Sequence, residues 1–172
     1  MNPRLMTLVM IVLAAALMRI LPHPPNVTPV AAMALFAGAH FADRKLALVV
    51  PLLAMLMSDL VLGLHQTLLF VYLGVALTVL IGTTLRGRAR PLPAMGAALL
   101  ASVLFFLLTN FGVWLTGTLY PHTVQGLFAA YTAGLPFFRN SLLGDLFWTA
   151  VLFGGYRALA AYWPDLRETR TA

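Results

Sequence analysis

Asp59 and His65 are the two residues of this sequence whose types and positions most directly suggest chemistry. Asp59 lies inside a long apolar run, and His65 follows just past the end of that run. A carboxylate within a segment of membrane-spanning length is energetically expensive, so such a residue usually has a function or a paired partner. A neutral imidazole in a tight loop can bind a metal or form a hydrogen bond with a substrate. The two residues together predict a polar site at one end of an apolar helix.

The composition indicates an integral membrane protein. Of the 172 residues, 61% are hydrophobic and 9% are charged, whereas soluble domains are about 45–50% apolar and about 25% charged. The net charge of +6 comes from 11 Lys+Arg against 5 Asp+Glu. These charges lie in short gaps between apolar runs, where they orient a protein in a membrane; no basic stripe predicts nucleic-acid binding. The sequence has no cysteine, which excludes disulfides and thiolate catalysis.

Six apolar runs predict an all-α membrane protein with six transmembrane helices in a single domain over residues 1–172. The first run could be a signal peptide, but further apolar runs follow at once, so we expect a retained helix. The second run is shorter than the roughly 20 residues of a perpendicular span, which predicts a buried helix. Residues 118–138 are expected to form a long loop with a short helix over 124–133. The expected spans are 5–21, 28–41, 46–63, 68–85, 93–117 and 140–162.

The positive charges predict the orientation of these spans. Counted in alternate gaps, nine basic residues fall on one side of the membrane and two on the other. Cytoplasmic loops carry the excess of Lys and Arg, so both termini are expected in the cytoplasm and the protein in the bacterial inner membrane, as a multi-pass protein. The nine are Arg4, Arg44, Lys45, Arg86, Arg88, Arg90, Arg157, Arg167 and Arg170; the two are Arg19 and Arg139.

This orientation places the remaining polar residues towards the outer surface. Asp59 and Asp145 are each four or five residues inside the outer end of a span, which is ~6 Å at 1.5 Å per residue. We expect a site for a small organic solute there, with the carboxylates orienting donor groups, Trp114 stacking on a flat part of the solute and His65 capping it. The candidate substrate-binding residues are Asn26, Asp59, His65, Asn110, Trp114, Arg139, Asn140 and Asp145.

Most of these candidates also have a structural explanation. Asp59 with Arg19, or Asp145 with Arg139, could be buried ion pairs that fix helix register. Asn110 could only bridge helices, and the aromatic residues of the last two spans could be packing residues. The alternative function is therefore a structural or assembly membrane protein with no transported ligand. That alternative requires both carboxylates to be fully paired, with no cavity on the outer side.

The sequence contains no recognisable pattern of catalytic or metal-binding residues. It lacks G-x-S-x-G, H-E-x-x-H and Gly-rich phosphate-loop motifs. His23, His65 and His122 lie in different loops without the spacing of metal ligands. A membrane enzyme acting on lipid or isoprenoid would need a converging nucleophile, base or metal. We therefore expect no enzyme activity, no catalytic residue, no cofactor and no bound metal.

Four segments carry a resemblance to a known family: NVTPVAAMALF (26–36), SDLVLG (58–63), FFLLTNFGVW (105–114) and GLPFFRN (134–140). Through them the chain resembles the membrane-embedded substrate-binding (S) components of energy-coupling factor (ECF) vitamin transporters, within an uncharacterised bacterial subgroup of that fold. The resemblance implies a six-helix bundle that binds a vitamin or its precursor near the outer surface, under the loops at 22–27, 64–67 and 118–138. It implies a scaffold subunit and two ATPases as partners.

Solitary cobalamin transporters of the same fold are also similar. Their members use a cysteine near the loop after the third helix as a cobalt ligand, whereas His65 is the only soft donor in that loop here. Cobalamin is therefore one candidate substrate, and His65 would ligate cobalt only in that case. Family members often carry A-x-x-x-A on the first helix for scaffold docking, but residues 14–16 here are consecutive alanines. Coupling to a shared scaffold thus stays open at this point.

Overall fold

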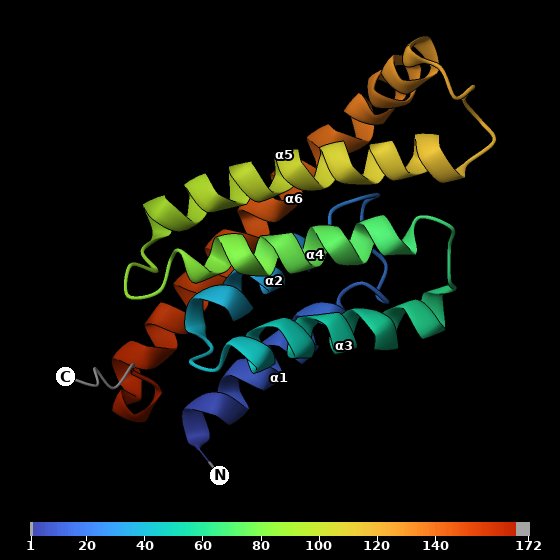
Figure 1. Ribbon diagram of the computed structural model, residues 1–172. Coiled ribbons are helices and arrows are strands. Elements are labelled where there is room, and N and C mark those ends of the chain that lie inside the picture. The colour runs from blue at the N-terminus through green and yellow to red at the C-terminus, as the bar shows by residue number, and fades with distance from the viewer. Residues whose placement is uncertain (1, 168–172) are drawn as a thin grey trace.

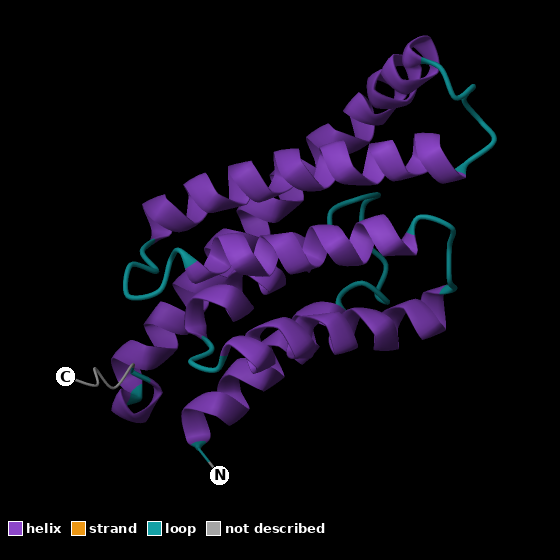
Figure 2. Cartoon of the chain, viewed as in Figure 1, coloured by secondary structure: helices purple, strands orange, loops and turns teal. Residues whose placement is uncertain are grey.

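The computed structural model describes residues 2–167 and shows an all-α protein (Figure 2). No strand occurs in that part of the chain. The helices are α1 (Pro3–Leu17), α2 (Val30–His40), α3 (Arg44–Leu62), α4 (Leu68–Thr83), α5 (Pro91–Thr116) and α6 (Val124–Tyr162), followed by a short 3₁₀ helix, η1 (Pro164–Leu166).

Polar caps and a glycine set several of the helix ends. The Asn2 and Asp43 side chains accept hydrogen bonds from backbone N–H groups in the first turns of α1 and α3. Thr123 does the same for α6, accepting from the N–H of Gly126 at 3.1 Å. Gly63 ends α3 with a φ of 103°, a conformation that favours glycine. These residues satisfy backbone groups that the helices themselves leave unpaired.

The short helix α2 forms the centre of the bundle. All 11 of its residues are buried, and it contacts each of the other five α helices. Gly38 of α2 meets Gly82 of α4 so closely that a Cβ added at either would overlap a backbone carbonyl oxygen of the other helix, at Val79 or Leu35. The expectation of a buried second helix is confirmed, and small residues are the reason that α4 can lie against it.

Within residues 2–167, two helices are long and apolar enough to cross a membrane. They are α3 with 19 residues and α5 with 26, and the buried share of their apolar stretches is only 33% and 22%. The core helix of a soluble protein would instead be mostly buried. Large apolar side chains of α3, such as Leu53, Met57 and Leu60, are exposed on the outside of the bundle, as expected where lipid rather than water surrounds a helix.

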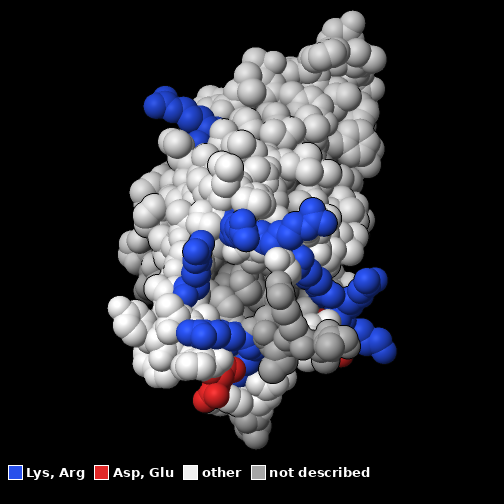
Figure 3. Space-filling view, turned by 90° about the vertical axis from the view of Figure 1, so that its left-hand side faces the viewer, with Lys and Arg blue, Asp and Glu red and all other residues white. Residues whose placement is uncertain are grey.

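The helices run up and down, so the loops collect at two ends of the molecule (Figure 1). Both ends of the described chain lie at one end with the α2–α3 and α4–α5 loops, and Lys and Arg side chains gather there (Figure 3). We call this the basic end; the other, with the α1–α2, α3–α4 and α5–α6 loops, is the opposite end. Arg170, which the sequence assigns to the basic side, lies outside the described residues.

Helix α6 differs from the sequence-based expectation. It is one helix of 39 residues with Pro136 inside it. The expected short helix over 124–133 is therefore present as the start of α6, whereas the loop expected after it, over 134–138, is wrong. An interior proline costs a helix about 3 kcal/mol or more in isolation. Packing against α5 offsets this cost: the Tyr131 hydroxyl donates to the Leu107 carbonyl oxygen at 2.9 Å, and Phe106 packs against Tyr131 and Phe138.

Candidate functional site

Two adjoining cavities lie at the opposite end of the bundle. The first, of about 280 Å³, includes Arg19, His23 and His65 in its lining, and we call it the Arg19 cavity. The second, of about 180 Å³, lies between α5 and α6 and has four phenylalanines in its lining; we call it the phenylalanine cavity. Both are lined by Asn26, Phe105, Ser141 and Asp145. The two cavities therefore form one candidate site with a shared polar wall.

Asp145 is the most unusual group in this site. Its side chain is buried, with 6% of the residue exposed, and it lines both cavities. The Ser102 hydroxyl of α5 lies 2.6 Å from one carboxylate oxygen and 2.8 Å from the Ala98 carbonyl oxygen, so its single proton is shared between these two acceptors. Within residues 2–167, no Arg, Lys or His side chain forms an ion pair with it. The alternative of an Asp145–Arg139 pair is therefore not what the structure shows, since Arg139 is exposed and lines neither cavity.

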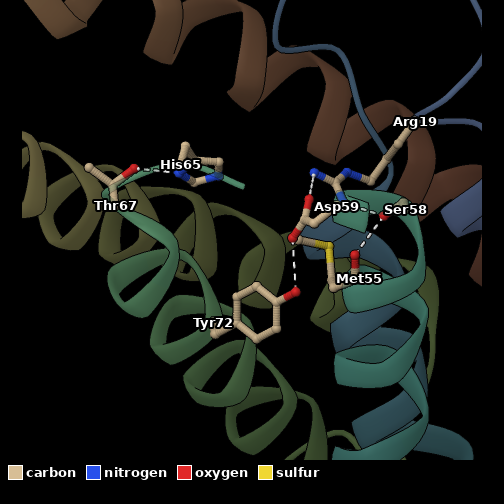
Figure 4. Close-up of polar contacts among 7 residues, drawn as sticks. All are labelled: Arg19, Met55, Ser58, Asp59, His65, Thr67 and Tyr72. Atoms are coloured by element: carbon tan, nitrogen blue, oxygen red, sulfur yellow. Dashed lines mark hydrogen bonds and ion pairs between the residues drawn. The ribbon is translucent and has the colours of Figure 1, made fainter. Parts of the chain in front are cut away.

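Asp59 has the opposite environment, because it is fully paired. The Arg19 guanidinium donates to one carboxylate oxygen at 2.8 Å, and the Tyr72 hydroxyl donates to the other at 2.9 Å (Figure 4). Arg19 also donates to the Ser58 hydroxyl, which in turn donates to the Met55 carbonyl oxygen. Asp59 is 1% exposed and lines neither cavity. Of the five residues in this network, Arg19 and Met55 line the Arg19 cavity. The Asp59 carboxylate lies outside the cavity lining and holds the Arg19 guanidinium in place.

The end of α1 explains how Arg19 reaches Asp59. The sequence predicts a span to residue 21, but the helix ends at Leu17 and tight turns follow, with the N–H of Arg19 donating to the Ala16 carbonyl oxygen at 3.1 Å. Pro22, Pro24 and Pro25 follow closely and cannot continue a helix. The arginine therefore lies in the α1–α2 loop, beside α3.

His65 lies in the α3–α4 loop, at the edge of the Arg19 cavity. It is exposed, and its Nδ1 lies 2.9 Å from the Thr67 hydroxyl (Figure 4). Residues 2–167 contain no group of three or more His, Asp or Glu side chains that could hold a metal ion. The position of His65 thus fits hydrogen bonding to a solute at the cavity edge.

The three asparagines have different positions around the site. Asn26 lines both cavities and has a φ of 63°, which asparagine tolerates better than most residues. Asn110 lines the phenylalanine cavity, donates to the Phe106 carbonyl oxygen at 2.9 Å, and fits beside α6 only because Gly134 has no side chain. Asn140 lines neither cavity; it donates to the Pro25 carbonyl oxygen at 3.2 Å and ties the α1–α2 loop to α6.

Trp114 lies away from both cavities. Its indole N–H donates to the Pro121 carbonyl oxygen at 3.0 Å, and its ring contacts Phe111 and His122. The predicted stacking of Trp114 on a solute therefore has no support in this geometry. The residue instead fastens the loop between α5 and α6.

Sequence reasoning missed Ser102, Phe105 and Ser141 as site residues. A weak signal for one of them was present: Ser102, Thr109 and Asn110 recur at seven- and eight-residue intervals in an apolar run, which places polar groups on one face of a helix. Ser102 and Thr109 both line the phenylalanine cavity. Phe105 and Ser141 carried no such signal.

Comparison with known proteins identifies the family. No curated protein and no solved structure matches the chain. A family model described as "Family of unknown function (DUF6580)" matches residues 1–166. Because that match covers nearly the whole sequence, the chain belongs to DUF6580, a family of unknown function.

Proposed function

We propose that this protein is a membrane-embedded binding component for the uptake of a small organic solute, of the vitamin or vitamin-precursor type, from the outer side of the bacterial inner membrane. One observation carries the proposal: Asp145 is buried without a basic partner among the described residues, yet lines two adjoining cavities at one end of the bundle. A donor group on a solute would supply the missing partner.

The energetic cost of Asp145 supports this function. Burying an ionised carboxylate costs several kcal/mol unless paired groups compensate, and the Ser102 hydroxyl is a single, uncharged donor. An apolar residue at this position would serve a purely structural bundle better. A ligand that donates hydrogen bonds to the Asp145 carboxylate would offset the free-energy cost of burying it, which explains why this residue occurs here.

The walls indicate what the solute looks like. Phe105, Phe106, Phe137 and Phe138 line the phenylalanine cavity together with Asp145. Few polar groups among apolar walls are typical of small-molecule sites. Aromatic faces beside a carboxylate favour an apolar or aromatic solute with an ammonium or amide N–H donor. The two cavities of about 280 and 180 Å³ together lie towards the lower end of the roughly 300–1,000 Å³ of typical ligand pockets. We therefore favour a small solute over cobalamin, and His65 as a hydrogen-bonding residue over a cobalt ligand.

We place all six helices in the membrane, with the basic end in the cytoplasm. The gathering of Lys and Arg at one end of the described chain supports this orientation. At 1.5 Å per residue, α6 is about 58 Å long, well beyond the roughly 30 Å hydrocarbon core, so its first turns would extend past the outer surface. We further propose that a scaffold subunit and ATPases drive inward release, as the resemblance to ECF S components implies.

The rival function is a structural membrane protein without a ligand. The closed network of Arg19, Asp59 and Tyr72 favours it, because that network is complete without any solute. Asp145 argues against a structural role alone, because that role requires this carboxylate, like Asp59, to be paired and to line no cavity.

Mass spectrometry of the solute that co-purifies with the gently extracted protein tests the proposal. We expect the parent to retain a solute, Asp145→Asn to lose it, and His65→Ala to retain it more weakly. Asp165→Asn is the matched control, because Asp165 lies at the basic end in η1, and it should retain the solute like the parent. The proposal fails if no preparation carries a solute, or if a folded Asp145→Asn variant retains as much as the parent.

A further inference from the structure

A third cavity lies at the basic end, at the other end of the bundle from the proposed solute site. It has a volume of about 410 Å³ and lies between the start of α1, the end of α2, the α4–α5 loop and the last turns of α6 with η1. Within residues 2–167, four arginines and no Asp or Glu line it; the arginines are Arg4, Arg90, Arg157 and Arg167. We propose that this basic cavity binds a phosphate-bearing group.

Backbone carbonyl oxygens hold two of these arginines in place. Arg4 donates to the His40 carbonyl oxygen at 2.9 Å, and Arg167 donates to the carbonyl oxygens of Ala160 and Ala161 at 2.9 and 3.1 Å. Because these acceptors at the ends of α2 and α6 are uncharged, they orient the Arg167 guanidinium without neutralising it. Fixed guanidinium groups lose little entropy when an anion binds.

The other two arginines lie ready for a ligand. The side chains of Arg90 and Arg157 form no hydrogen bond or ion pair with another residue of the described chain, and both are exposed. Positive charges that converge on a concave surface raise the local concentration of anions. Arginine is the side chain that best matches the oxygens of phosphate, through paired N–H donors.

The floor of the basic cavity is rigid. The Tyr156 hydroxyl donates to the Leu166 carbonyl oxygen at 2.7 Å, which fastens η1 onto α6. The Tyr156 ring packs edge-on against His40 at 4.7 Å and against Phe36 at 5.4 Å between ring centroids. The cavity therefore exists before any ligand binds.

The orientation of the protein does not by itself explain this arrangement. An excess of Lys and Arg at one end is expected of any membrane protein with that end in the cytoplasm, and Arg44, Lys45 and Arg88 at the same end do not line the cavity. Convergence of four arginines from separate segments is a feature of the cavity alone. An anionic lipid headgroup and a free phosphate compound share the chemistry that would fit it.

The test uses the full-length protein in nanodiscs. One arm compares pure phosphatidylcholine nanodiscs with nanodiscs containing phosphatidylglycerol, and counts bound lipid by native mass spectrometry. The other arm titrates inorganic pyrophosphate against protein in phosphatidylcholine nanodiscs at constant ionic strength, and follows thermal stability. We expect saturable binding in at least one arm, and the arm identifies the source of the phosphate. The Arg90→Gln/Arg157→Gln double variant should weaken that binding about thirtyfold.

The matched control is Arg44→Gln/Lys45→Gln, which removes two positive charges from the same end without touching the cavity lining. It should bind like the parent. Equal weakening by both double variants would mean that only the overall charge of this end attracts anions, and would overturn the proposal. So would the absence of saturable binding in both arms. Because the Arg90 and Arg157 side chains form no hydrogen bond or ion pair within residues 2–167, the double variant should keep the melting temperature of the parent.

Discussion

Arg19 and Asp59 lie forty residues apart in the sequence and form an ion pair of 2.8 Å inside the bundle, with Asp59 only 1% exposed. The pair joins the loop after α1 to the last turn of α3. It also fixes the position of Arg19 at the edge of a cavity. One carboxylate thus has its partners within the fold, whereas the second, Asp145, has no basic partner among residues 2–167.

Removing either partner of this pair should destabilise the protein strongly. Asp59→Asn or Arg19→Gln leaves a buried charge without its partner, which costs about 3–5 kcal/mol. Thermal unfolding in detergent should show this loss, and the double variant should lose less than the sum of the two single variants. Asp165→Asn, a substitution at the basic end, should unfold like the parent. Additive losses would mean that the two side chains stabilise the fold independently.

Tyr72→Phe should have a smaller effect on the same network. It removes only the hydroxyl that donates to Asp59 at 2.9 Å, and a hydrogen bond to a charged group contributes about 1.5–3 kcal/mol. In an Asp59→Asn background the same change should cost less, since the acceptor is then neutral. An equal cost in both backgrounds would show that the ring, and not the hydroxyl, is what Tyr72 contributes.

Asp145→Asn should behave in the opposite way to Asp59→Asn in ligand-free protein. Because no basic side chain of the described residues pairs with Asp145, neutralising it should leave the free energy of unfolding unchanged or raise it by up to about 1 kcal/mol. Ser102→Ala should instead cost about 2 kcal/mol by removing the donor at 2.6 Å. Unfolding measured after solute removal checks both. A large loss in Asp145→Asn would assign this residue a structural role.

The fold was predictable from the sequence wherever apolar runs are separated by prolines, glycines or charges. Helices α1 to α5 each fall within or close to an expected run, because those residues end helices by local chemistry. The continuity of α6 was not predictable in this way, because residues 134–139 separate the expected short helix over 124–133 from the expected last span. Pro136 and the surrounding polar residues indicate a loop locally, and only contacts with α5 made from far along the chain, such as Tyr131 with Leu107, hold the helix together.

The sequence predicted at which end of the bundle the candidate residues lie, but not which of their side chains face the cavities. Counting residues from the ends of the spans brought Asn26, His65, Asn110 and Asp145 to the same end of the bundle, and the cavities include all four. Counting residues from the end of a span does not show which side of the helix faces the cavities. It therefore could not distinguish Trp114, whose indole donates to the Pro121 carbonyl oxygen away from the cavities, from residues of α5 that line them.

The contact between α2 and α4 makes a separate prediction about packing. In Gly38→Ala the new Cβ would overlap the Val79 carbonyl oxygen, and forcing atoms into a packed core costs about 1–3 kcal/mol. Gly96→Ala on α5 is the matched control, because an added Cβ there meets no described atom within 4 Å. The control should be neutral, or stabilising by roughly 0.5–1 kcal/mol through helix propensity. Equal unfolding temperatures for the two variants would contradict the close approach of α2 and α4.

The proposed orientation predicts which loops a reagent can reach from outside the cell. The sequence has no cysteine, so single substitutions report one position each without background. Gln66 and Arg88 are both exposed, in the α3–α4 loop at the opposite end and in the α4–α5 loop at the basic end. Gln66→Cys should react with a membrane-impermeant maleimide on intact bacteria, and Arg88→Cys only after permeabilisation.

The outcome separates the topologies because α4 alone connects these two loops. Its 16 residues extend about 24 Å, slightly less than the roughly 30 Å hydrocarbon core, so the helix reaches both surfaces only with its flanking loops. Labelling of both positions on intact cells would mean that α4 does not cross the membrane. Labelling of Arg88→Cys alone would reverse the orientation, and the basic cavity would then face the outside, with the Asp145 site facing the cytoplasm. An uptake role for that site would be excluded by this result.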